Sequence, residues 1–198
     1  MSALILASGS VVRRALLENA GLSISVQKPL LDEEAIKNAM LAESAPPRDI
    51  ADILAQEKAR KISNKNPGAL VLGCDQVLDF QGRLLSKPTS PENAREQLLS
   101  MRGRRHSLLS AAVLFENGKP IWRHVGHVRL TMRDFSDSYI DAYITRNWDE
   151  IQHCVGGYML EKEGIRLFSK IEGDYFSVLG LPMIELLNYL ALKGAIDG

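Results

Sequence analysis

The stretch Ala-Leu-Val-Leu-Gly-Cys-Asp-Gln at residues 69–76 starts as an apolar run and ends with a carboxylate beside an amide. Branched apolar residues in such a run predict a buried β-strand. The small residues Gly73 and Cys74 would let neighbouring groups approach that strand closely. Ligands bind where strands end in open α/β sheets, and a carboxylate there can hold a metal or take a proton from water. The stretch therefore predicts a functional acid, Asp75, at a strand end. The alternative is an acid that only starts a turn before residues 80–82.

The composition is that of an ordinary globular protein, with 198 residues, 45% of them hydrophobic and 24% charged. We expect one domain over residues 1–198. Lys and Arg together number 24, as do Asp and Glu together, so the formal net charge is zero. The chain therefore has no overall positive charge that would favour stable nucleic-acid binding. No apolar run has the length of a membrane-spanning helix, and we expect no membrane partner. Two cysteines without a Cys-x-x-Cys pair, and no secretory signal, favour the cytoplasm.

The N-terminal segment predicts an anion site. Residues 3–7 read as a buried strand, residues 8–10 as a loop of small residues, and residues 11–20 as a helix. The first turn of a helix offers free N–H groups and the positive end of the helix dipole. The hydroxyls of Ser8 and Ser10 and the guanidinium of Arg13 lie beside that turn in the sequence. We therefore expect these three residues to bind phosphate.

Strands and helices mix along the rest of the chain, which favours an α/β or α+β class with a mainly mixed sheet. Ser90 followed by Pro91 predicts the start of a helix, and Asn117-Gly118 predicts a hairpin turn. The expected strands are 23–27, 107–115 and 121–131, with a short hairpin through 81–82, and the expected helices are 34–43, 48–63, 90–103, 136–146 and 182–192.

Lys58 continues an apolar stripe at four-residue spacing from Ile50 and Leu54. This spacing predicts a lysine that reaches a pocket, and a lysine whose stem covers the core while its charge reaches water is the alternative. Other polar residues also follow expected elements: Asp32, Glu33, Asp75, Gln76 and Lys87. Cations and helix ends neutralise phosphate oxygens, and acids bind a divalent ion or activate water. Together these residues suit a polyphosphate with a divalent ion, although any one of them alone is typical of a solvated surface.

Several ordered motifs along the chain resemble the Maf family of nucleoside triphosphate pyrophosphatases. The resemblance runs essentially end to end, and its motifs are LILASGSVVRRALLENAGL at 4–22, DEE at 32–34, LAQEKA at 54–59, VLGCDQV at 71–77, SKP at 86–88, MRGRRHSLLSAAVL at 101–114 and GGYMLEKEGIRLFSKIEGDYFSVLGLP at 156–182.

The resemblance implies an elongated α/β fold of the Maf and ITPase type, with a mixed sheet flanked by helices and a cleft between two lobes. It implies hydrolysis of a nucleoside triphosphate to monophosphate and pyrophosphate with a divalent metal, Mg or Mn. It suggests a house-cleaning role, in which the enzyme removes non-standard nucleotides. It also suggests a homodimer.

Site residues follow from the same resemblance. Asp75 matches the family's proton acceptor, and with Glu33 we expect it to hold the metal. Ser8, Arg13, Glu33, Lys58 and Lys87 match positions that contact substrate and phosphate.

Three positions are associated with base choice in the family: Val12, Gln76 and Glu161. The branch acting on dTTP and UTP resembles Arg, Thr and Gln there, and the branch acting on 7-methyl-GTP resembles an apolar aromatic, Gln and Glu. The chain is therefore nearer the second branch, and Glu161 could accept hydrogen bonds from a guanine edge. Val12 departs from both patterns, because it is neither the phosphate-contacting arginine nor an aromatic that stacks on a base.

Two other function classes remain open at the sequence level. Because Val12 stands in place of arginine, the alternative stays open that the protein is a non-catalytic nucleotide-binding regulator of cell division. An RNA-binding module is disfavoured by the neutral net charge and by the lack of an aromatic stacking stripe.

Overall fold

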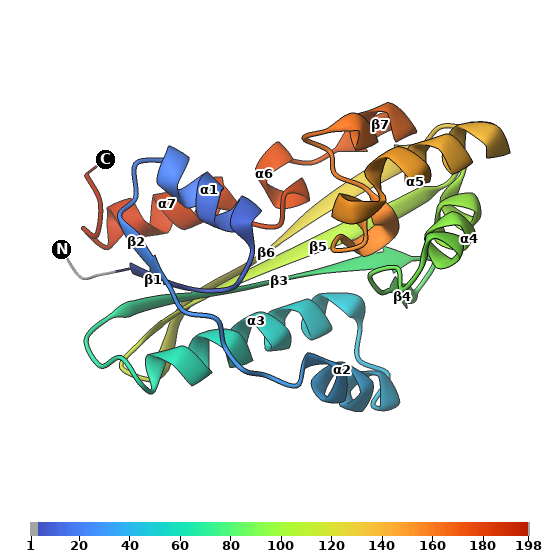
Figure 1. The fold of residues 1–198 in the computed structure, drawn as a ribbon. Coiled ribbons are helices and arrows are strands. Elements are labelled where there is room, and N and C mark those ends of the chain that lie inside the picture. Colours follow the sequence, from blue (N-terminus) through green and yellow to red (C-terminus); the bar gives the residue numbers. More distant parts are fainter. Residues whose placement is uncertain (1–3, 198) are drawn as a thin grey trace.

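The fold is built on one mixed sheet, and the computed structural model describes residues 4–197. β1 lies parallel to its two neighbours, and every other strand pair is antiparallel. The elongated sheet and its flanking helices (Figure 1) confirm the predicted class. The strand order of the seven-stranded sheet is β2 (Ile24–Val26), β1 (Leu4–Ala7), β3 (Leu70–Phe80), β5 (Arg105–Glu116), β6 (Lys119–Met132), β7 (Phe168–Glu172), with β4 (Arg83–Leu85) paired to β3.

β3 corrects the expectation that the strand ends at Asp75. It continues five residues further, to Phe80, because β5 pairs with it over almost its whole length, from Leu70 opposite Glu116 to Asp79 opposite Ser107. β1 is the strand that ends here, with Ala7 opposite Gly73. Asp75 therefore lies within β3, just past the carboxyl end of β1, and it starts no turn.

Side chains alternate between the two faces of β1 and β3, as the twofold period of a strand requires. Leu70 and Leu72 face α1 (Val11–Asn19) and α7 (Met183–Leu192), where they share a core with Leu17 and Leu186. Val71 faces the opposite side, together with Ile5, and packs with residues of α3 (Pro47–Ser63). Figure 1 shows these helices on opposite faces of the sheet, with α2 (Glu33–Ala42) beside α3. Two apolar layers thus fix the sheet from both sides.

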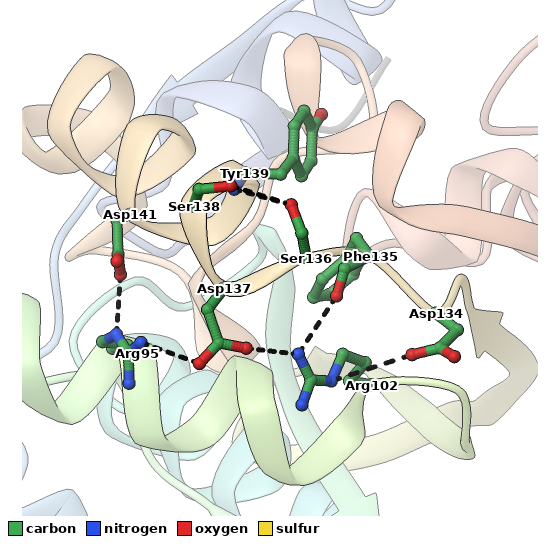
Figure 2. Close-up of polar contacts among 9 residues, drawn as sticks. All are labelled: Arg95, Arg102, Asp134, Phe135, Ser136, Asp137, Ser138, Tyr139 and Asp141. Atoms are coloured by element: carbon green, nitrogen blue, oxygen red, sulfur yellow. Dashed lines mark hydrogen bonds and ion pairs between the residues drawn. The ribbon is translucent and has the colours of Figure 1, made fainter.

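A third core lies at the other end of the sheet, where α4 (Pro91–Met101) and α5 (Asp137–Ile151) pack together (Figure 1). Figure 2 shows an ion-pair network between the two helices, in which Asp137 accepts from Arg95 at 3.1 Å and from Arg102 at 2.6 Å. Asp141 also accepts from Arg95, at 2.6 Å. These pairs are solvent-exposed, and such pairs typically contribute about 0–1 kcal/mol each. The buried apolar core is therefore the main stabilising contact between α4 and α5.

The expected elements are found with small shifts at their ends. The Asn117-Gly118 hairpin is confirmed, and both residues take the positive φ angles, 52° and 73°, of a type I′ turn. α5 runs five residues past the predicted end at residue 146. Ala3, which the sequence assigns to the first strand, lies outside the described residues. Elements that the sequence did not predict are short: β7, α6 (Tyr175–Val178), and the 3-10 turns η1 (Val155–Gly157) and η2 (Glu163–Leu167). In the described part of the chain, no helix is both long and apolar enough to cross a membrane.

Candidate active site

A buried lysine placed between two carboxylates forms the centre of the site. The Nζ atom of Lys58 lies 2.6 Å from Oδ1 of Asp75 and 2.9 Å from Oε2 of Glu33. Lys58 and Asp75 are each only 7% exposed, whereas Glu33 is exposed at the start of α2. The alternative of a lysine whose charge reaches water is therefore wrong, because two acids hold the ammonium inside the protein.

Gly73 allows this contact. A Cβ atom at Gly73 would lie 2.1 Å from the carbonyl oxygen of Ala55 and 2.7 Å from the amide nitrogen of Ala59, both in the backbone of α3. α3 therefore packs directly on β3 at this position, in the same helical turn that carries Lys58. The close approach predicted from the small residue is what places Lys58 within reach of Asp75.

Opposing effects act on the pKa of the Asp75 carboxyl group. Burial raises its pKa, and the Glu33 carboxylate raises it further, while the Lys58 ammonium and the Arg13 guanidinium oppose this rise. A carboxylate with a raised pKa holds a proton more readily than an ordinary aspartate does. The ion pair with Lys58 favours the ionised form of the carboxyl group and so works against the effect of burial on its pKa.

Arg13 reaches the same region from α1. Its Nη1 atom donates to the carbonyl of Cys74, next to Asp75, at 3.2 Å and to Ser8 Oγ at 3.4 Å. Ser10 caps α1, since its Oγ accepts from the Arg13 amide at 3.3 Å. Ser8 Oγ also accepts from the Ser10 amide at 3.2 Å. The turn between β1 and α1 thus brings two hydroxyls and a guanidinium to the carboxyl end of β1, as the sequence predicted.

Gln76, the residue after Asp75, points to the other side of β3. Its Nε2 atom donates to the carbonyls of Ser177 and Val178 at 3.1 and 2.9 Å and to Ser110 Oγ at 2.9 Å. The sequence did not predict these contacts of Ser110 and of the segment around Ser177. A serine inside the apolar strand 107–115 was a signal for Ser110, but its partner is distant in sequence.

The remaining predicted residues lie nearer the surface. Lys87 and Glu161 are exposed, and Val12 is half-buried on α1. Burial raises the pKa of the Cys154 thiol to about 11, with Glu161 raising it further and Lys87 lowering it. Lys87 and Glu161 therefore lie near the same cysteine. Within residues 4–197, no hydrogen bond or ion pair joins Val12, Lys87 or Glu161 to the group around Asp75, and their roles stay predictions.

The donor set suits a metal that is bound together with a ligand. Asp75 and Glu33 supply hard carboxylate oxygens close to one point, but the described residues contain no group of three or more His, Cys, Asp or Glu side chains that could hold an ion. Mg²⁺ is usually held by one or two carboxylates plus substrate phosphates and water. The two acids fit that pattern, in which the remaining oxygens come from a bound ligand and water.

Comparison with known proteins identifies the family. The sequence profile described as "Maf-like protein" matches residues 3–192. The chain belongs to this family. A relative named nucleoside triphosphate pyrophosphatase, from Ruegeria pomeroyi, is 68% identical over 194 residues, which are 98% of each chain. A relative named 7-methyl-GTP pyrophosphatase, from Mesorhizobium japonicum, is 46% identical over 195 residues, again 98% of each chain.

Among solved structures, a dITP/XTP pyrophosphatase from Mycobacterium abscessus aligns over 98% of each chain with 14% identity and a TM-score of 0.41. That likeness is too distant to inform function. The predicted Maf membership is confirmed by the family match and by the two relatives.

Proposed function

We propose that this Maf protein is a nucleoside triphosphate pyrophosphatase, which cleaves a triphosphate to nucleoside monophosphate and pyrophosphate. The observation that carries the proposal is the buried lysine between Asp75 and Glu33, with Arg13 at the same edge of β1. This arrangement offers cations for phosphate and a base for water within a few ångströms. It accords with relatives named nucleoside triphosphate pyrophosphatase at up to 68% identity.

The phosphates would bind at the turn between β1 and α1. Arg13 keeps guanidinium N–H groups for an anion, because only its Nε and Nη1 atoms donate to protein groups in the described structure. The Ser8 and Ser10 hydroxyls and the Lys58 ammonium lie beside it, and Lys87 would approach from the segment after β4. Donors fixed before substrate arrives stabilise the charge that develops on the leaving pyrophosphate.

Asp75 would act as the general base. It takes a proton from water while the water oxygen bonds to the α-phosphorus. The bond from that phosphorus to the oxygen bridging the α- and β-phosphates breaks, and its electron pair leaves with pyrophosphate. A base whose pKa is raised above that of an ordinary aspartate holds the transferred proton more readily, which suits this step.

A divalent cation, Mg²⁺ or Mn²⁺, would be held by Glu33 and Asp75 and would neutralise phosphate charge when bound. Lys58 contacts both carboxylates, so it holds the two acids near one another before the triphosphate and its cation arrive.

The base preference would be set at Gln76, Glu161 and Val12. Glu161 is an acceptor suited to the N1–H and N2–H₂ edge of guanine, and its charge favours a cationic methylated base. Modified nucleotides such as 7-methyl-GTP are therefore the favoured substrates, which suits house-cleaning in the cytoplasm.

The test is release of pyrophosphate by purified protein, with and without Mg²⁺, from dTTP, UTP, CTP, GTP and 7-methyl-GTP. The proposal expects metal-dependent release, fastest from a guanine nucleotide. Binding of nucleotides without release from any of them would favour the non-catalytic regulator of cell division instead.

A further inference from the structure

We propose that residues 174–180, here named the α6 turn, are a positioning element that holds Gln76 and Arg13 in one fixed arrangement, with Ser110 as a positioning residue. The inference rests on the proposed function and adds to it a specific mechanism for base selectivity. The α6 turn belongs to the C-terminal part of the chain, and it contacts two substrate-facing residues that come from different elements, β3 and α1.

The α6 turn fixes which end of the Gln76 amide faces outward. Nε2 lies 3.1 and 2.9 Å from the carbonyl oxygens of Ser177 and Val178. A carbonyl oxygen only accepts hydrogen bonds, so the nitrogen, and not the oxygen, must face it. The Oε1 atom therefore points away from the turn, and Gln76 offers a ligand only an acceptor.

Ser110 completes this arrangement from β5. Its side chain is fully buried, its Oγ accepts from Gln76 Nε2 at 2.9 Å, and it donates to the Ser177 carbonyl at 2.6 Å. The hydroxyl thus links the amide to the turn that orients it. Without that hydroxyl, Gln76 keeps its two carbonyl partners but loses the contact that fixes its position along β3.

The far end of the α6 turn holds Arg13. The Gly180 carbonyl accepts from Arg13 Nε at 2.8 Å. Gly180 has a φ of +97°, and a Cβ atom there would lie 3.1 Å from the guanidinium. Any larger residue at this position is strained and presses on Arg13. The phosphate-facing guanidinium and the base-facing amide are therefore held by carbonyls of the same short segment.

The α6 turn is itself fixed to the sheet and to its own cap. A Cβ atom at Gly126 of β6 would lie 2.3 Å from Ser177 Oγ, so the turn packs directly on the bare backbone of that strand. Asp174 caps the turn by accepting from the Ser177 amide at 2.8 Å. These contacts make the turn a rigid support for Gln76 and Arg13.

The experiment measures kcat and KM for every triphosphate in the panel, in wild type and in Ser110→Ala. Removal of one buried hydrogen bond is expected to lower the ratio of kcat/KM between the best and the worst triphosphate by about tenfold. Ser107→Ala is the matched control, since Ser107 lies on the same strand and its hydroxyl contacts His127 instead of the site. The control is expected to keep the wild-type ratio.

A double-mutant cycle separates positioning from a general structural effect. In a Gln76→Ala background, Ser110→Ala should change the selectivity ratio no further, because it acts through Gln76. An undiminished effect of Ser110→Ala in that background, or a wild-type ratio in Ser110→Ala alone, overturns the proposal.

Gly180→Ala tests the other end of the turn and keeps the proposal falsifiable if Ser110→Ala does not fold. It should raise KM for every triphosphate by about tenfold, since a hydrogen bond to a charged group is lost or bent. An unchanged KM overturns the proposal. A wild-type protein that hydrolyses no triphosphate refutes the proposed function instead, so the two failures are distinguishable.

Discussion

Gly73→Ala should move Lys58 away from Asp75 and break their ion pair, without changing either residue. The new Cβ would lie 2.1 Å from the Ala55 carbonyl oxygen and 2.8 Å from the Ala59 Cβ, whereas ordinary non-bonded contacts lie near ~3.5 Å. The α3 backbone must therefore retreat by more than about 1 Å, which is large against the 2.6 Å contact between Lys58 and Asp75. Overpacking of this kind costs about 1–3 kcal/mol of stability.

The effect on turnover should exceed the effect on folding. A misplacement of about 1 Å in an active site can lower the rate about 100-fold. Urea unfolding measures the stability, and pyrophosphate release measures kcat. Gly68→Ala is the control, since Gly68 has a positive φ, 79°, which Gly73 lacks, and nothing lies within 4 Å of its Cβ position. It should lose comparable stability through backbone strain, about 1–2 kcal/mol, and keep wild-type turnover. Wild-type turnover in Gly73→Ala would refute the role given to the close packing of α3.

Two further predictions concern titrating groups. Lys58→Met removes a charge that lowers the Asp75 pKa, so the acidic limb of the kcat/KM profile should move to higher pH, and an unmoved limb would contradict the pairing. His106 is buried, and burial lowers its pKa to about 4 from 6.5. The unfolded chain then binds more protons between these values, so stability is lost as pH falls from 6.5 towards 4. Between pH 7 and pH 5, the free energy of unfolding of His106→Gln, measured in urea, should fall by about 2 kcal/mol less than that of wild type. An equal fall in both proteins would refute this.

Most of the fold could be predicted because the spacing of apolar residues and the turn residues specify helices, strands and turns locally. The stripe of Ile50, Leu54 and Lys58 indicated both a helix and its buried face, and the structure confirms both. The Asn117-Gly118 turn was predicted for the same reason, since its conformation depends on those two residues.

Errors arose where distant partners decide the structure. β3 continues past Asp75 because β5 pairs with residues 75–79, and the position of a polar residue in the sequence cannot reveal that pairing. The helix α6 is only four residues long, and the α6 turn around it depends on the Asp174 cap and on Gly126 in another strand. For the site, the sequence indicated the acids and cations that the structure brings together around Lys58, but not Ser110, whose two hydrogen-bond partners lie in other elements.

The central claim is that Asp75 is the base in a pyrophosphatase site, and the most direct test is pyrophosphate release by Asp75→Asn beside wild type. Asparagine preserves the shape of the side chain but cannot accept the proton from water. The account predicts metal-dependent release by wild type and a loss of at least about 100-fold in kcat for a variant that unfolds at the same temperature. Release by Asp75→Asn at the wild-type rate would contradict it.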